Sequence, residues 1–291
     1  MHIRIYRIIA FFLQFVGSNL CHQSNTTPFL IQIEHNASAF FFYHLKRFVE
    51  LVGVSKANSS VDSAMLEYCI REDLKLSRAR MMAVLKPLKL IIDNYPEGQT
   101  EDLVMPNTLE NPELGSRVIP FGRELWIEED DFREEPPKKY FRLFPGNEVR
   151  LMGAYFVKCV GVDKDETGKV VAVHCTYDPE TKSGTGFEGR KVKGTIHWVN
   201  ASTAVNAECR LYENLVDEEK GKLDANGNLN LNPNSRIILK DCKLEPNFDG
   251  AKAYDSYQFV RNGFFCVDSK DSRPDSLVFN RIVSLKSSFK L

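Results

Sequence analysis

The first regular hydrophobic pattern in the chain has the period of an α-helix. Apolar residues recur every three or four positions before Gly53, a residue type that commonly ends helices: Phe41, Leu45, Phe48, Val49 and Val52. A second stripe follows Ser60, a suitable N-cap, and comprises Met65, Leu66, Cys69 and Ile70, with Arg71, Glu72 and Asp73 outside it or near its end. The two stripes predict a small helical module over residues 41–79, in which the helices pack on each other.

After residue 80, apolar and polar residues alternate with the period of a β-strand. We predict strands at 88–92, 149–157, 170–177, 195–199, 237–239, 257–267 and 278–285. Asn262-Gly263 predicts a hairpin with a type I′ turn, which requires positive φ at both central residues, and residues 165–168 predict a second hairpin. Because no helical pattern separates these strands, we expect a mainly β protein with closed barrels, in which the polar run at 217–234 is a long loop.

Composition narrows the class of protein. A chain of 291 residues, 43% of them hydrophobic, can form more than one compact core. A formal net charge of −1 argues against a protein that coats nucleic acid indiscriminately, so any nucleic-acid site is local. The seven cysteines are scattered without a C-x-x-C pair, which fits reduced thiols better than disulfides or zinc ligands. His174 and Cys175 point to opposite faces of a predicted strand, and we interpret both as ordinary strand residues.

The N-terminal segment is unlike the rest of the chain. Basic residues up to Arg7, an apolar run at 8–16 and the small residues Gly17 and Ser18 imitate a secretory signal. The apolar run is too short to span a bilayer, however, and no A-x-A cleavage site follows it. We therefore expect a cytoplasmic protein without a membrane partner, in which the four N-x-[ST] triplets have no role. Secretion is the alternative, and the sequence leaves open whether residues 1–40 fold.

The sequence contains none of the common catalytic motifs. It has no G-x-x-x-x-G-K-[ST] phosphate loop, no G-x-G-x-x-G, no H-E-x-x-H and no G-x-S-x-G. Acidic residues cluster at 128–131 and 134–135, and we interpret them as a solvated face because such clusters are more often solvated than catalytic. We therefore predict no catalytic residue and no metal ligand.

Cations and aromatic residues occur together in two segments. Residues 136–143 read PPKKYFRL and lead to a predicted strand in which Arg150 faces opposite Val149 and Leu151. Residues 189–200 place three cations between two glycines directly before another predicted strand: Arg190, Lys191 and Lys193. Lysine and arginine attract phosphate, and aromatic planes stack on unpaired bases, so these segments favour single-stranded RNA as the ligand. A merely solvated basic surface is the alternative.

The order of short motifs along residues 43–291 resembles that of bacterial-type, class I glutaminyl-tRNA synthetases. The matching segments are VMPN (104–107), PELGSR (112–117), IPF (119–121), residues 140–151, TYD (176–178), GRKVKGTIHWV (189–199), RLY (210–212) and FNR (279–281). Glutamyl enzymes of the same class match His197-Trp198 less well. The resemblance implies the C-terminal part of such an enzyme, with a helical subdomain at 41–79 and two interleaved β-barrels at 80–291 that bind the anticodon loop of glutamine tRNA.

The resemblance also implies which side chains hold the splayed anticodon bases. The positions that match the family pattern are Arg80, Lys138, Lys139, Arg142, Arg150, Gln258 and Arg261. We assign Arg190, Lys191 and Lys193 to the RNA backbone or to the barrel junction. The chain departs from the family at Phe141 and Met152, where cations are common, at Val260, where an acid is common, and at Ile282, where a hydroxyl is common.

Two signatures of the family's catalytic domain are missing from this sequence, namely a His-Ile-Gly-His-like motif and a Met-Ser-Lys loop. Val54-Ser55-Lys56 lies between the predicted helices and is not such a loop. Residues 1–40 resemble no part of the family, which suggests a truncated gene product or a misplaced start.

We therefore expect tRNA binding without catalysis and without a cofactor in this chain. In the full-length family enzyme, ATP and Mg²⁺ serve the attachment of glutamine to its tRNA. Two alternatives stay open. The chain could act as a ligase when paired with a separately encoded catalytic domain, or it could be a general RNA-binding barrel that resembles ribosomal barrel proteins.

Overall fold

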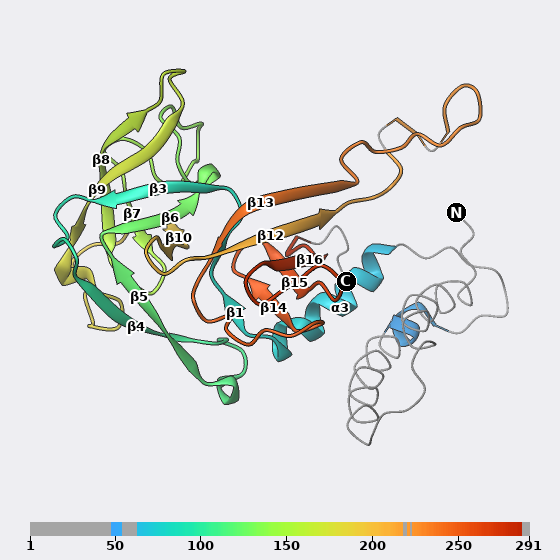
Figure 1. Ribbon diagram of the computed structural model, residues 1–291, viewed down its shortest axis with the longest axis horizontal. Helices are drawn as coiled ribbons and strands as arrows, with labels where there is room; N and C mark the ends of the chain where they lie inside the picture. Colours follow the sequence, from blue (N-terminus) through green and yellow to red (C-terminus); the bar gives the residue numbers. More distant parts are fainter. Residues whose placement is uncertain (1–47, 54–62, 218–219, 222, 287–291) are drawn as a thin grey trace. The chain divides into compact units, whose positions relative to one another are not determined.

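The computed structural model describes residues 48–53, 63–217, 220–221 and 223–286 (Figure 1). The chain divides into two compact units, one that ends at Lys75 and includes Lys286, and one that runs from Leu76 to Leu285. In the first unit, residues 48–52 are helical, and α3 spans Ser63–Ser77. The expectation for residues 1–40 and the N-cap at Ser60 lie outside the described residues.

The buried face of α3 matches the predicted stripe only in part. Cys69 is buried, whereas the other three residues of the stripe, Met65, Leu66 and Ile70, are half-buried. Arg71, which we predicted to face outward, is buried, and its guanidinium donates a hydrogen bond of 3.1 Å to the carbonyl of Lys286. This partner is distant in sequence, so the pattern around Arg71 could not indicate it.

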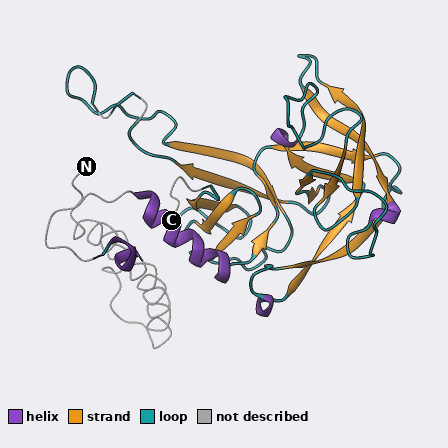
Figure 2. Ribbon diagram, turned by 180° about the vertical axis from the view of Figure 1, so that it is seen from behind, coloured by secondary structure: helices purple, strands orange, loops and turns teal. Residues whose placement is uncertain are grey.

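The second unit contains two curled, nearly closed sheets of seven strands each, which confirms the predicted barrel architecture (Figures 1 and 2). The inserted barrel comprises β3 (Pro87–Ile92), β6 (Glu124–Glu128), β7 (Glu148–Leu151), β8 (Phe156–Lys164), β9 (Val170–Asp178), β10 (Thr195–Ile196) and β11 (Val199–Asn200). The split barrel comprises β1 (Arg80–Met81), β2 (Ala83–Val84), β12 (Val205–Tyr212), β13 (Arg236–Leu244), β14 (Ser256–Phe259), β15 (Gly263–Val267) and β16 (Leu277–Val283). The inserted barrel therefore interrupts the split barrel in sequence. A separate hairpin consists of β4 (Thr100–Pro106) and β5 (Ser116–Gly122).

Each sheet is closed by one short segment whose two halves pair with opposite edges. In the inserted barrel, β10 runs parallel to β7, and β11 runs antiparallel to β6 at the other edge. In the split barrel, β1 runs parallel to β14, and β2 runs antiparallel to β13. The predicted single strand at 195–199 is therefore wrong. The chain leaves one edge at His197-Trp198 and joins the other, so these two residues lie between two short strands.

The segment from β1 to β2 supplies side chains to both hydrophobic cores. Met81 and Ala83 belong to the core of the split barrel, whereas Met82 and Val84 belong to that of the inserted barrel. Consecutive side chains of an extended chain point to opposite sides, so this alternation follows from strand geometry. The two barrels consequently share one extended segment as a common wall.

Two other strand predictions need correction. The segment predicted as one strand at 149–157 is divided into β7 and β8 by a tight turn in which Gly153 has a φ of 68° and the Ala154 amide donates to Leu151 O at 2.9 Å. The predicted hairpin at 257–267 is confirmed as β14 and β15, but its turn is not type I′. Phe259 pairs with Gly263 across a three-residue loop, and the residue with left-handed φ in that loop is Arg261, at 66°.

The alternation of apolar and polar residues also did not predict β4, β5, β6 and β12. In β4 every second residue is less exposed, but Glu101 occupies one of these positions and Val104 is exposed, so residue type does not follow the alternation in burial and a search for alternating hydrophobicity misses the strand. The predicted hairpin turn at 165–168 is confirmed between β8 and β9, where the Gly168 amide donates to Asp165 O at 2.9 Å. In the polar run at 217–234, the described residues include an isolated bridge between Leu223 and Leu229.

Six of the seven cysteines lie among the described residues, and all six are free thiols. The described part of the chain holds no cluster of side chains suited to a metal ion and no helix that is long and apolar enough to cross a membrane.

His174 lies on β9 with its ring between two carboxylates, at 2.8 Å from Asp93 Oδ1 and 3.0 Å from Asp163 Oδ2. Hydrogen bonds to Asp163 and Asp93 raise the pKa of His174 above its usual value.

The stability of the chain is expected to fall as His174 loses its proton. A raised pKa in the folded state means that the protonated ring stabilises the fold below the ordinary histidine value of 6.5, and that this contribution disappears as the pH rises through the higher folded pKa. Because the site is partly exposed, we expect a change of roughly 0.5–1 kcal/mol in the free energy of unfolding. Urea unfolding at a series of pH values measures it. The His174→Gln variant should lack this pH-dependent step, and an unchanged profile in that variant would contradict the assignment.

Candidate nucleic-acid interface

Two of the predicted site residues, Arg142 and Arg261, contact one buried carboxylate that the sequence analysis did not select. Asp131 ends a single 3₁₀ turn after β6 and is fully buried. Its two oxygens accept hydrogen bonds from both terminal nitrogens of Arg261, at 2.6 and 2.7 Å, and lie 3.0 Å from a terminal nitrogen of Arg142. Arg261 comes from the split barrel and Asp131 from the inserted barrel, so this group joins the two barrels. Burial alone would lower the pKa of Arg261, but the hydrogen bonds and charge of Asp131 raise it.

The loop from 137 to 143 carries the predicted lysines and is fixed by hydrogen bonds to the Asp131 region. The Tyr140 hydroxyl donates to Asp130 O at 3.0 Å, and the Leu143 amide donates to Asp131 O at 3.0 Å. Burial, together with the charge of Asp131, raises the pKa of Tyr140 to about 12. Lys138 and Lys139 are exposed at the outer side of the loop, and Lys139 has a left-handed φ of 66°. A rigid loop thus presents two solvated amines.

Arg150 occupies the outer face of β7 while its neighbours Val149 and Leu151 are buried, as the alternation predicted. Its guanidinium lies 4.2 Å from the centre of the Phe156 ring, and one of its nitrogens donates to Ser183 Oγ at 2.8 Å and to Thr181 O at 3.2 Å. Desolvation lowers the pKa of Arg150. The side chain is therefore held against an aromatic ring and by two neutral oxygens.

The three cations of the glycine-flanked segment have different environments. Arg190 is bound by two carboxylates, with nitrogen–oxygen distances of 2.6 Å to Glu148 and 2.8 Å to Asp178, so much of its charge is neutralised. Lys193 places its amine 5.5 Å from the centre of the Phe141 ring. Lys191 is exposed to solvent. Of the three, the lysines are better suited than Arg190 to contact phosphate.

Arg80 and Gln258 lie opposite each other on the neighbouring strands β1 and β14. Arg80 is half-buried and Gln258 is 8% exposed. Arg261 belongs to the turn that follows β14, which places the three split-barrel candidates on one hairpin and its neighbouring strand. Val260, where the family often has an acid, is buried in the core of the inserted barrel.

Backbone contacts link Arg150 and the glycine-flanked segment to the lysine loop. The Arg150 amide donates to Gly194 O at 2.9 Å, and Thr195 pairs with Arg150 where β10 joins β7. A Cβ atom built on Gly194 would overlap the carbonyl oxygen of Phe141, so the lysine loop packs directly on the glycine. The surface therefore runs from Arg261 through Asp131 and the lysine loop to Arg150. We call it the basic strip.

A second acid, Glu128, whose side chain is 13% exposed, also contributes to the junction between the barrels. Glu128 accepts hydrogen bonds from the Leu85 and Lys86 amides, at 2.9 and 3.0 Å, and from the Asn262 side chain at 2.9 Å. The ring of His197, which is fully buried, lies 3.5 Å from Glu128 and 3.0 Å from Ala83 O. Burial would raise the pKa of Glu128, but these partners lower it. The interpretation of residues 128–131 as a solvated face is thus wrong for Glu128 and Asp131.

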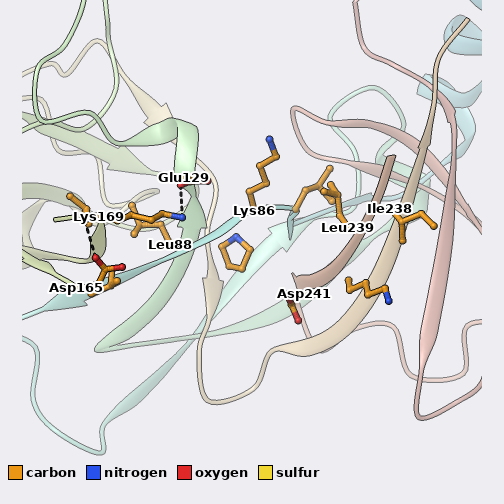
Figure 3. Close-up of a pocket in the computed structure, with 13 residues that line it drawn as sticks. Lys86, Leu88, Glu129, Asp165, Lys169, Ile238, Leu239 and Asp241 are labelled. Carbon is orange, nitrogen blue, oxygen red and sulfur yellow. Dashed lines mark hydrogen bonds and ion pairs between the residues drawn. The ribbon is translucent and has the colours of Figure 1, made fainter. Parts of the chain in front are cut away.

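A groove of 710 Å³ lies between the two barrels (Figure 3). Its walls include Leu88 on one side and Ile238 on the other, together with an ion pair of 3.1 Å between Lys169 and Glu129. None of the predicted RNA-binding residues lines it. Acids and lysines balance one another along its walls, so the groove offers no concentration of charge that would attract a polyanion.

Two family models match the chain. Both describe the anticodon-binding domain of class I tRNA synthetases for glutamate and glutamine, and they match residues 79–178 and 195–268, together more than half of the chain. The chain belongs to this family of anticodon-binding domains. All seven residues predicted to hold anticodon bases lie in the two matched regions, whereas Arg190, Lys191 and Lys193 lie between them.

Individual relatives of this synthetase family show the same relationship. The chain is 57% identical to the glutamine–tRNA ligase of Clostridium perfringens over 251 residues, which are 85% of this chain and 45% of that protein. It is 55% identical to the glutamine–tRNA ligase of Clostridioides difficile over 247 residues, or 84% of this chain and 45% of that protein. The ligase of Bradyrhizobium diazoefficiens is 51% identical over 245 residues, or 84% and 44% of the respective chains. The chain thus spans about half the length of the curated relatives it matches.

The contact between Gly194 and the lysine loop can be tested by adding one methyl group. In Gly194→Ala the new Cβ would overlap Phe141 O and lie 3.2 Å from Val149 Cγ1, and a backbone oxygen cannot rotate away as a side chain can. We expect a loss of about 1–3 kcal/mol in the free energy of unfolding, measured by urea titration. Gly161→Ala is the matched control, since its Cβ would meet only His174 Cβ at 3.8 Å. Equal stability of the two variants would contradict the described packing.

Proposed function

We propose that this chain binds the anticodon loop of glutamine tRNA along the basic strip. The proposal is supported chiefly by the way both barrels contribute restrained arginines to one surface around Asp131. Phosphate contacts position an RNA, whereas base contacts select its sequence. In this assignment the exposed Lys138, Lys139, Lys191 and Lys193 engage phosphates. Arg80, Arg142, Arg150, Gln258 and Arg261 face unstacked bases. A cytoplasmic location belongs to the same proposal.

Binding to two tRNAs tests this assignment. We expect the chain to bind a glutamine tRNA transcript more tightly than the same transcript with a substituted anticodon. The affinities are measured at several salt concentrations, because the affinity at one salt concentration combines sequence-independent attraction to phosphate with recognition of bases. Equal affinity for both transcripts would contradict anticodon reading. Equal affinity for unrelated RNA hairpins as well would favour the general RNA-binding barrel instead.

Two substitutions separate base contact from phosphate contact. Arg150→Gln should weaken binding of the glutamine tRNA by about 1–3 kcal/mol and reduce discrimination between the two transcripts, because it removes a guanidinium that is fixed on Phe156. Lys191→Gln should weaken binding of both transcripts equally and reduce the slope of log affinity against log salt by about one. A uniform loss in Arg150→Gln would show that Arg150 contacts phosphate only.

We further propose that the chain supports glutamine–tRNA ligation only together with a catalytic part such as the rest of the clostridial ligases. The relatives that carry the ligase name extend well beyond the matched region. In this proposal ATP and Mg²⁺ bind to that other part. Glutaminyl-tRNA formation by the chain mixed with the unmatched half of the Clostridium perfringens ligase is the expected result, with each part alone as the control. If the mixture forms no glutaminyl-tRNA, the ligation proposal is contradicted. The RNA-binding proposal is tested separately by the binding measurements above.

A further inference from the structure

We propose that Asp131 is a positioning residue for RNA recognition, which orients Arg142 and Arg261 and offsets their charge so that they select bases and do not bind any phosphate. The inference rests on the proposed function, because it concerns the same surface. It adds a role for an acid, whereas the RNA contacts proposed above are made by cations and a glutamine.

The geometry around Asp131 restrains both arginines without enclosing them. Arg261 uses both of its terminal nitrogens on the carboxylate, at 2.6 and 2.7 Å, and Arg142 uses one, at 3.0 Å. Asp131 itself is 0% exposed, whereas the side chains of Arg261 and Arg142 are 26% and 42% exposed. Each guanidinium therefore keeps a surface that an RNA base can reach.

Other contacts hold the same group in place from several sides. Arg261 sits at a left-handed φ of 66° in the β14–β15 turn, and its guanidinium also lies 3.4 Å from Nδ1 of the buried His197. Arg142 also donates to the carbonyl of Asp130 at 3.1 Å. Asp131 thus contacts arginines of two different barrels, by hydrogen bonds from Arg261 and an ion pair with Arg142, while its own carbonyl fixes the loop by accepting from the Leu143 amide. The position of each arginine depends on the carboxylate between them.

The charge arrangement explains why such an acid aids selection. Two free arginines beside each other would attract any phosphate, because the electrostatic part of RNA binding does not depend on sequence. One carboxylate between them cancels about half of that charge and restricts the side chains before RNA arrives. A side chain that is restrained before binding loses less conformational entropy when the RNA binds. A base that fits the restrained guanidinium therefore gains more binding free energy than a base that does not fit. Lys138 and Lys139, which are exposed, supply the unselective attraction.

Asp131→Asn and Asp131→Glu separate the charge from the geometry. In Asp131→Asn the arginines lose their counter-charge, so we expect several-fold tighter binding of the anticodon-substituted transcript and a salt slope steeper by about one. The ratio of affinities for the two transcripts should fall about tenfold. In Asp131→Glu the charge stays but the carboxylate is displaced by one methylene, so the ratio should fall while the salt slope remains that of the unaltered chain.

Glu134→Gln provides the matched control. Glu134 is close to Asp131 in sequence but pairs with Lys164, at 2.8 Å, and is 39% exposed. Its replacement removes one negative charge without touching an arginine. We expect a small, equal gain in affinity for both transcripts and an unchanged ratio.

The results distinguish this inference from the proposed function. If the unaltered 291-residue chain does not distinguish the two transcripts, the proposed function fails first. If it does distinguish them and both Asp131 variants keep its ratio of affinities, the positioning role is overturned. Thermal unfolding of every variant accompanies the binding series. Unfolding of both Asp131 variants at the assay temperature would also overturn the inference, because Asp131 would then be required by the barrel junction alone.

Discussion

The two barrels depend on one extended segment, residues 81–84, that supplies side chains to both of their cores. Met81 and Ala83 pack in the split barrel, and Met82 and Val84 pack in the inserted barrel. The period of two in a strand leaves no freedom in this arrangement, since a shift by one residue would exchange all four side chains between the cores. The same segment closes the split barrel through β1 and β2. The register of one short segment therefore fixes both the closure of a barrel and the place where the second barrel begins.

The two barrels are also joined by polar contacts, whose stability depends on charged groups and their hydrogen-bond partners rather than on apolar packing. Glu128 and Asp131 lie at the junction, where Asp131 makes three hydrogen bonds or ion contacts and Glu128 makes four. A buried carboxylate is tolerated when such partners are complete, and removal of one partner leaves a charge that costs several kcal/mol. The junction between the two barrels therefore tolerates few rearrangements of its side chains. That rigidity allows residues from two barrels, far apart in sequence, to form one surface with a fixed shape.

Much of this architecture could be predicted from the sequence, and the failures have physical causes. Alternation revealed part of the strands and the β8–β9 and β14–β15 hairpins, because the signal is local, whereas β4, β5, β6 and β12 were missed. The closing segments were predicted wrongly or missed, because a strand of two residues carries no period and its pairing is decided by the sheet edges around it. Asp131 and Glu128 were misread as solvated since their acidic neighbours suggest an exposed cluster. Their partners Arg261 and Asn262 lie about 130 residues further along the chain, where no local pattern connects them.

The arginines and the lysines of this surface have different environments, and the net charge of the chain does not show this difference. The chain is nearly neutral, and three of its acids contact arginines of this region: Asp131 holds Arg142 and Arg261, and Glu148 with Asp178 holds Arg190. Arg150 is held instead by an aromatic ring and neutral oxygens. The lysines of the basic strip remain at its solvated margin. A planar guanidinium offers directional hydrogen bonds once its orientation is fixed, whereas a mobile ammonium acts as a point charge. Under the proposed function, acids that orient the arginines would sharpen selection among bases, while the solvated lysines of the basic strip would keep the attraction that brings an RNA to the surface.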